Sequence, residues 1–218
     1  MVDFLRVVRV FGAEATSVAK PQEKAAQHPA STHSEVRTAR AGVHALLCGR
    51  AVSVPPPHLL LLPGLACDAD VWKHQAHALA GVTTVSVADY GISDSLERMA
   101  SVAIQQAPQR FALAGHSMGA RVAFEIVRRA PERVAGLAIL DSAYKPRAAG
   151  EAGEREKANR FALLNIAQTQ GMRAMALAWL PGIVHPARLA DQPLVASIVE
   201  MICRKTPEIF AAQIKALL

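Results

Sequence analysis

The sequence predicts an α/β fold in which a mostly parallel sheet carries helices on both faces. Short apolar runs alternate with helix-patterned segments between residues 58 and 140, and this alternation is typical of βαβ units. The runs are apolar throughout rather than at every second position, as expected for strands that are buried on both faces. Right-handed crossovers between such strands place helices on both sides of the sheet.

The elements follow in a regular order. His58–Leu62 is the first expected strand, and a helix capped by Asp68 or Asp70 follows it to about Ala80. The alternation continues with strand Thr83–Ala88, helix Asp94–Ala107, strand Arg110–Gly115, helix Met118–Ala130 and strand Val134–Leu140. The turns that follow the strands meet at the carboxyl edge of the sheet, where open α/β sheets hold their ligands.

The alternation stops after Asp141, and only helices are expected beyond it. Glu151–Leu180 predicts one or two helices that end at Pro181-Gly182. Prolines suited to a first helical turn open two more, at Pro193–Arg204 and Pro207–Leu218. An apolar helix face is expected from the spacing of Met172, Met175, Leu177, Trp179 and Leu180.

Residues 1–57 differ from the rest of the chain. Thr16–Arg40 holds almost no large apolar residues, so its burial cannot offset the entropy lost on ordering. We expect a disordered or weakly structured extension over 1–57, a partial α/β core over 58–145 and a helical region over 146–218.

Composition argues against several classes of function. The formal net charge is +6, but the basic residues are scattered and do not form the patch that nucleic acid needs. No apolar run is long enough to span a bilayer, and Met1–Phe11 has no continuous apolar stretch for export. The three cysteines show no C-x-x-C spacing, which disfavours disulfides and a metal site. We expect a cytoplasmic protein.

The motif with chemical content is Gly115-His116-Ser117-Met118-Gly119. It is G-x-S-x-G between an expected strand and an expected helix, the context in which the serine is held on a strained turn with its hydroxyl exposed. The turn demands small residues at 115 and 119, and the Met118 amide at the helix N-terminus is suited to an oxyanion. The competing interpretation is a glycine-rich strand–helix turn in another α/β protein.

The first loop adds a resemblance. Leu61–Trp72 reads L-L-P-G-L-A-C-D-A-D-V-W, and together with the serine motif it resembles the small esterase-like members of the α/β-hydrolases. The resemblance implies that Ser117 is the nucleophile, that the amides of Leu65 and Met118 hold the oxyanion, and that the helices after Asp141 form a cap. It also implies a small ester or thioester substrate and no cofactor.

The chain departs from that family in its catalytic base. In the family an acid and then a histidine follow the serine, with the histidine after the last strand, and no strand is evident beyond Leu140. We therefore expect the C-terminal strands and the histidine to belong to a portion that this chain lacks. Asp141 is the candidate acid, and His185 follows it in the right order but fits a polar residue between cap helices.

Two further residues are candidates for the substrate pocket. Trp72 either packs its helix onto the sheet or lines an acyl pocket. His116, inside the motif, is expected to point away from Ser117 and to pack against a neighbouring strand.

The resulting function hypotheses differ in class. The first is a serine hydrolase that forms an acyl-enzyme at Ser117. The second is a truncated derivative that is catalytically inactive or only binds. A third keeps the fold but runs lyase or peroxidase chemistry, since fold alone does not decide the reaction. The sequence leaves the oligomeric state open.

Overall fold

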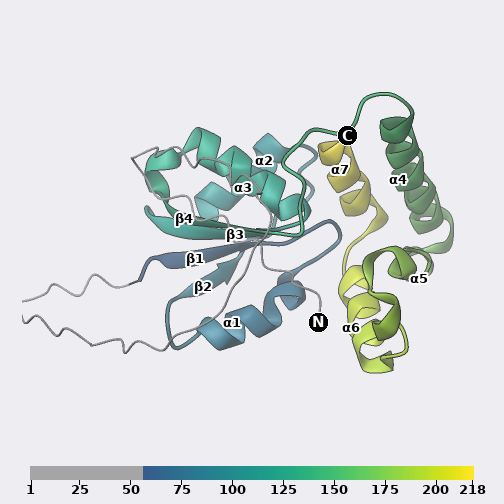
Figure 1. Cartoon of the computed structure of the whole chain (residues 1–218), viewed down its shortest axis with the longest axis horizontal. Coiled ribbons are helices and arrows are strands. Elements are labelled where there is room, and N and C mark those ends of the chain that lie inside the picture. The colour runs from purple at the N-terminus through teal and green to yellow at the C-terminus, as the bar shows by residue number, and fades with distance from the viewer. Residues whose placement is uncertain (1–55) are drawn as a thin grey trace, which may run out of the picture. The chain divides into compact units, whose positions relative to one another are not determined.

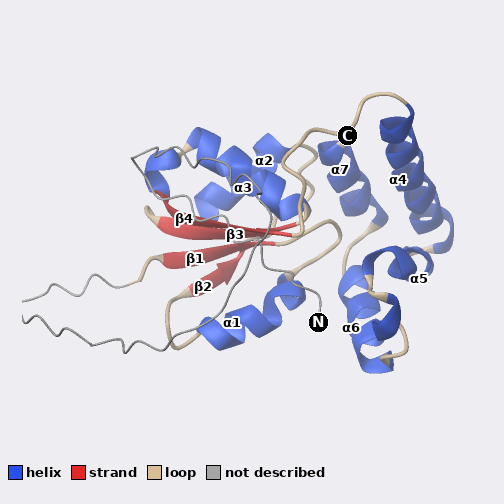
Figure 2. Ribbon diagram, in the orientation of Figure 1, coloured by secondary structure: helices blue, strands red, loops and turns tan. Residues whose placement is uncertain are grey.

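The computed structural model describes residues 56–218, and the expectations for residues 1–55 lie outside this range. Four strands form one sheet in the order β2-β1-β3-β4, with every neighbouring pair parallel (Figure 2). Their bounds are β1 His58–Leu62, β2 Val85–Val87, β3 Phe111–His116 and β4 Val134–Leu140. The expected parallel sheet is confirmed, and β2 is shorter than its predicted range.

Helices cover both faces of this sheet (Figure 1). The 3₁₀ helix Ala69–Trp72 and α1 (Lys73–Leu79) lie on one face, and α2 (Leu96–Gln106) and α3 (Met118–Arg129) lie on the other. The side chains of successive β1 residues pack on opposite faces of the sheet. Leu60 and Leu62 join the core cluster under α2 and α3, whereas Leu61 packs with Trp72 and Ala114. A strand buried on both faces has to be apolar at every position, which explains the unbroken run.

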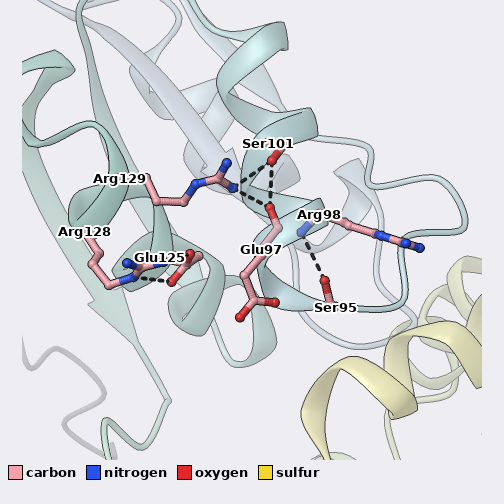
Figure 3. A network of polar contacts seen from close by, with 7 residues as sticks. All are labelled: Ser95, Glu97, Arg98, Ser101, Glu125, Arg128 and Arg129. Carbon is pink, nitrogen blue, oxygen red and sulfur yellow. Dashed lines mark hydrogen bonds and ion pairs between the residues drawn. The ribbon is translucent and has the colours of Figure 1, made fainter.

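Polar contacts join α2 to α3 on their outer side (Figure 3). The Ser95 hydroxyl caps α2 by accepting from the Arg98 amide at 3.2 Å. At the end of α3, the Arg129 guanidinium donates to the Glu97 carbonyl at 2.6 Å and to the Ser101 hydroxyl at 2.7 Å. The bonds of Arg129 fix the end of α3, the helix that follows Ser117.

Beyond β4 the described chain is helical. The helices are α4 (Glu151–Gln170), α5 (Met172–Ile183), α6 (Gln192–Cys203) and α7 (Pro207–Leu217). Prolines occupy the first turns of α6 and α7, as predicted, and the side chains of Asp191 and Thr206 cap these helices.

The predicted helix end at Leu180 is wrong by three residues, because α5 continues through Pro181 to Ile183. Of the one or two helices that the sequence allows before it, the structure has two, and they are divided at Gly171, whose φ of 88° lies outside the α-helical range. A proline removes one intrahelical hydrogen bond and crowds the carbonyl four residues earlier, and here the helix ends within a turn of it. The predicted face of α5 is also wrong at Leu177, which is 52% exposed.

Candidate functional site

Ser117 occupies the turn between β3 and α3. Its φ of 54° and ψ of −118° are strained for a residue with a side chain. The main chain is held on both sides of the strain, because the Ser117 amide donates to the Leu140 carbonyl at 3.0 Å and the Ser117 carbonyl accepts from the Ser142 hydroxyl at 2.9 Å. The hydrogen bonds found at Ser117 within residues 56–218 involve its main chain only. The hydroxyl is left without a partner in that range, and the side chain is half-buried.

Gly115 and Gly119 meet the predicted demand for small residues. A Cβ on Gly119 would lie 2.1 Å from the Leu62 carbonyl oxygen, and one on Gly115 would lie 2.6 Å from the Ala120 Cα. Both contacts are with backbone, which cannot rotate away as a side chain would. The turn therefore excludes any larger residue at either position.

The loop after β1 passes close to the serine. A Cβ on Gly64 would lie 3.2 Å from the Ser117 Cβ and 3.0 Å from the His116 Nδ1. The buried Tyr90 hydroxyl donates to the Pro63 carbonyl at 3.3 Å. The Cys67 amide donates to the Gly64 carbonyl at 3.1 Å and closes the turn. This loop and the serine turn are thus packed closely against each other at Gly64 and Ser117.

The two predicted oxyanion donors sit on these two turns. No main-chain acceptor is found for the Leu65 amide within residues 56–218. Met118 is the first residue of α3, so its amide has no acceptor inside the helix and lies at the positive end of the helix dipole. Within residues 56–218, neither amide is thus found bonded to a main-chain acceptor.

Asp141 follows β4 directly and adopts a φ of 46°. Because β4 is the parallel neighbour of β3, the carboxylate lies at the same sheet edge as Ser117. The side chain is exposed, and no hydrogen bond joins it to Ser117 or His116 in the described structure.

His116 packs against Trp72, as an edge-to-face pair with ring centroids 6.3 Å apart. Burial lowers the pKa of His116, and the nearby charge of Asp141 opposes this shift in part. Trp72 is 2% exposed, which favours its packing role beneath the sheet. Within residues 56–218, neither the His116 Nδ1 nor the Trp72 Nε1 has a hydrogen-bond partner.

The other candidates make no hydrogen bond to Ser117 in the described part of the chain. His185 caps the short helix Pro186–Arg188, where its Nδ1 accepts from the Ala187 amide at 3.2 Å. Burial and the Asp68 charge raise the pKa of Cys67 to about 12, so this thiol is not a nucleophile at neutral pH. A surface hollow of about 330 Å³ lies elsewhere, between α2, α3 and the loop at Tyr144–Pro146.

Sequence reasoning missed Gln213 of α7. Its Oε1 accepts from the Ala66 amide at 2.8 Å, across 147 residues of chain. A polar residue at an inward position of an amphipathic helix was the available signal, but it does not identify the partner.

The described residues hold no cluster of His, Cys, Asp or Glu suited to a metal ion. None of the helices described between residues 56 and 218 has the length and apolar character needed to cross a membrane.

Comparison with known proteins gives one family match and a set of similar chains. The thioesterase domain family model matches residues 58–202. Pimeloyl-[acyl-carrier protein] methyl ester esterases are similar: that of Nitrosomonas europaea is 32% identical over 94 residues, which are 39% of this chain and 37% of the relative. That of Klebsiella pneumoniae is 37% identical over 93 residues, 39% of this chain and 36% of the relative. The match thus spans well under half the length of these relatives.

Solved structures agree on the fold. A thermophilic esterase from Thermogutta terrifontis superimposes with a TM-score of 0.61 at 24% identity, over 74% of this chain and 63% of that one. An enol-lactonase from Burkholderia xenovorans gives a TM-score of 0.60 at 19% identity, over 74% of this chain and 65% of that one. The predicted α/β-hydrolase fold is confirmed by these likenesses together with the parallel sheet.

Proposed function

Since the chain belongs to the thioesterase domain family, within the α/β-hydrolase superfamily, we propose that it hydrolyses a small ester or thioester through an acyl-enzyme at Ser117. The observation that carries this proposal is the strained Ser117, at φ 54°, set against the Gly64 turn with two amides free to donate. Strain of this kind persists where the surrounding structure over-determines it, and it concentrates at reaction centres.

The proposed reaction has two steps. The Ser117 Oγ attacks the acyl carbon, the bond to the alcohol oxygen or thiol sulfur breaks, and the serine proton leaves with that group. Water then attacks the acyl-enzyme, which releases a carboxylic acid and restores the hydroxyl. In each step the amides of Leu65 and Met118 donate to the negative oxygen. Removal of one such donor lowers kcat by about 10²–10³-fold in enzymes that use this device.

A serine hydroxyl needs a base to attack at neutral pH. We propose Asp141 as the acid that would orient this base, because it ends the strand next to β3 at the same sheet edge. No metal or cofactor enters the proposed reaction.

Substrate contacts are proposed on the same two turns. His116 and Trp72 would lie on the β1 side of the acyl group. Because Trp72 is buried, their main contribution would be to fix the shape of the Gly64 turn. The curated relatives are named for esters of an acyl group carried on a protein, so an acyl ester or thioester is the class to test first.

The test uses a fluorophosphonate probe, which labels activated serines. The full chain is incubated with the probe, and the labelled residue is identified by mass spectrometry. We expect labelling at Ser117, turnover of p-nitrophenyl esters and short acyl thioesters, and loss of both in Ser117→Ala. Ser197→Ala, which removes an exposed serine hydroxyl of α6, should match the wild type. A folded chain without labelling at Ser117 would reject the proposal.

The second candidate is a protein that binds an acyl compound without turning it over. It is favoured by the Ser117 hydroxyl, for which no hydrogen-bonding base is found within residues 56–218. A soluble, cooperatively unfolding chain that is stabilised by an acyl ester but neither hydrolyses it nor reacts with the probe would support binding alone.

A further inference from the structure

Apart from the aromatic Trp72 and Tyr90, Gln213 is the one residue with a polar side chain that is almost fully buried among residues 56–218, at 2% exposure. It projects from α7 between Phe210 and Ile214, which are 0% and 1% exposed and belong to the main core cluster. Burial of an amide is unfavourable unless it is hydrogen-bonded. The partner of the Gln213 Oε1 is the amide of Ala66, at 2.8 Å.

Ala66 is itself strained. It is fully buried and adopts a φ of 56°, a conformation that residues with a Cβ rarely take. The strain lies directly after Leu65, so the angle at Ala66 helps to set the direction of the preceding peptide groups. If the turn at Ala66 relaxed, the peptide groups on either side of Leu65 would change direction.

Three hydrogen bonds hold the segment from Pro63 to Cys67. The Tyr90 hydroxyl donates to the Pro63 carbonyl, the Cys67 amide donates to the Gly64 carbonyl, and Gln213 accepts from the Ala66 amide. The first contact comes from the segment after β2, and the second lies within the loop itself. Only the third reaches it from α7, which is anchored by its own packing and by the Thr206 cap.

We propose that Gln213 is a positioning residue that holds the turn at Ala66 and thereby aims the Leu65 amide at the acyl oxygen on Ser117. This inference rests on the proposed function. It makes α7 part of the active arrangement, although none of its residues touches the reacting atoms. A donor that is displaced by a small distance loses more of its interaction with the transition state than with the bound substrate. The effect therefore falls on kcat more than on KM.

Two substitutions separate this role from packing. Gln213→Met keeps the length and volume of the side chain and removes the acceptor. Gln213→Glu keeps an oxygen acceptor at the same place, whether ionised or not. We expect kcat for ester hydrolysis to fall about 10–100-fold in Gln213→Met with KM changed by less than about threefold. Gln213→Glu should recover most of this loss. Gln168→Met, on the exposed side of α4, is the matched control and should behave as the wild type.

Hydrogen exchange gives a second measurement that does not depend on turnover. In the wild type the Ala66 amide should be protected, and in Gln213→Met it should exchange about tenfold faster or more, while the amide of Leu113 in the central strand keeps its protection. Thermal unfolding of each variant shows whether the fold is retained. Faster exchange throughout the chain, with Leu113 included, would overturn the inference, because Gln213 would then act on stability alone.

The outcomes separate the two proposals. If the wild type is active and labelled at Ser117 but Gln213→Met equals it in kcat or in Ala66 exchange, only the positioning role is overturned. If the wild type neither turns over an ester nor labels at Ser117, the proposed function fails. In that case Ala66 exchange decides whether Gln213 holds the turn, and unchanged exchange overturns this inference as well.

Discussion

Positive φ angles mark the residues at the carboxyl edge of the sheet. Within residues 56–218, Ala66, Ser117 and Asp141 are the residues with a side chain that adopt φ between 46° and 56°, and they follow β1, β3 and β4. Each such conformation costs about 1–2 kcal/mol. Three strained residues at one edge, with none described elsewhere, indicate that packing maintains a particular arrangement of the main chain there. This is the edge at which we place the chemistry.

The packing around the serine turn can be tested at Gly119. In Gly119→Ala the new methyl group would lie 2.1 Å from the Leu62 carbonyl oxygen, so β1 and α3 must separate. We expect a loss of about 2–4 kcal/mol in the free energy of unfolding, measured by urea denaturation. Gly136→Ala is the control, because a Cβ there meets nothing within 4 Å, and it should change stability by less than about 1 kcal/mol. Equal stability of the two variants would contradict the packing described for the turn.

At this scale the sequence predicts what is local. Gly115, Ser117 and Gly119 follow from a five-residue motif, because the steric demand of the turn acts between close neighbours in the chain. The pair of Ala66 and Gln213 does not follow from it, since the two residues are 147 positions apart. Nothing in the composition of the first loop indicates that an alanine there is left-handed. Contacts of this kind depend on tertiary packing, which a residue pattern does not encode on its own.

At the scale of elements, charged contacts tie the helices α6 and α7 to loops of the sheet region. The Arg204 guanidinium, at the end of α6, donates to both Asp68 oxygens at 2.7 and 3.1 Å and also pairs with Asp70. The Lys215 ammonium of α7 pairs with Asp94 at 2.6 Å. Asp68 caps the 3₁₀ helix after β1 and Asp70 lies in its first turn, so Arg204 holds the far end of the loop that carries Leu65.

Removal of Arg204 measures the strength of this link. The Arg204 side chain is 48% exposed and that of Asp68 is 22% exposed, so solvent weakens the attraction between the two charges. The two parallel hydrogen bonds of the bidentate geometry strengthen the pair. We expect Arg204→Met to lower the free energy of unfolding by about 1 kcal/mol at low salt, and by less at high salt. Arg155→Met breaks the more exposed pair with Glu151 and should have no measurable effect. If both variants behave alike, the link contributes nothing.

The same pair has a defined pH dependence. Partial burial by itself would raise the pKa of Asp68, but the hydrogen bonds from Arg204 and from the Asp70 amide outweigh burial and hold that pKa below its usual value. A lowered pKa means that the folded state binds the proton less readily than the unfolded state. The stabilisation is therefore complete above the ordinary aspartate pKa of about 4 and is lost as the pH falls below it. The stability gap between the wild type and Arg204→Met should close over that range.

Element boundaries show where sequence patterns stop being informative. The strands and helices around the motif lie within a few residues of their predicted ranges, because apolar runs and caps such as Ser95 are local signals. The helix predicted to end at Leu180 continues through Pro181 to Ile183, and the pattern does not decide that the segment before it divides into two helices at Gly171. Proline disfavours a helix, but one lost hydrogen bond in a last turn is outweighed by the packing of Met175 and Leu180. The balance between such terms is set by the tertiary structure.

For the whole molecule, the sequence predicts a parallel sheet but not the order of its strands. That order, β2-β1-β3-β4, comes from the pairings, and it places β4 at the edge. All seven residues of β4 are apolar or glycine, and all are only half-buried. Within residues 56–218 no strand pairs with the outer side of β4. An exposed apolar edge of this kind is a template for pairing with another chain.

The edge of β4 therefore predicts association that increases with protein concentration. Ala135 is the place to test it, because the register shift between β3 and β4 leaves this residue without a partner on β3, and it belongs to neither core cluster. Lysine on an edge strand opposes pairing by its charge and its hydration. We expect the weight-average mass of the wild type, from sedimentation at about 1–100 μM, to rise with concentration, and that of Ala135→Lys to rise less. Ala80→Lys adds the same charge at an exposed residue after α1 and should associate as the wild type does. A constant mass in the wild type, or equal association of the two lysine variants, would show that the β4 edge does not pair with other chains.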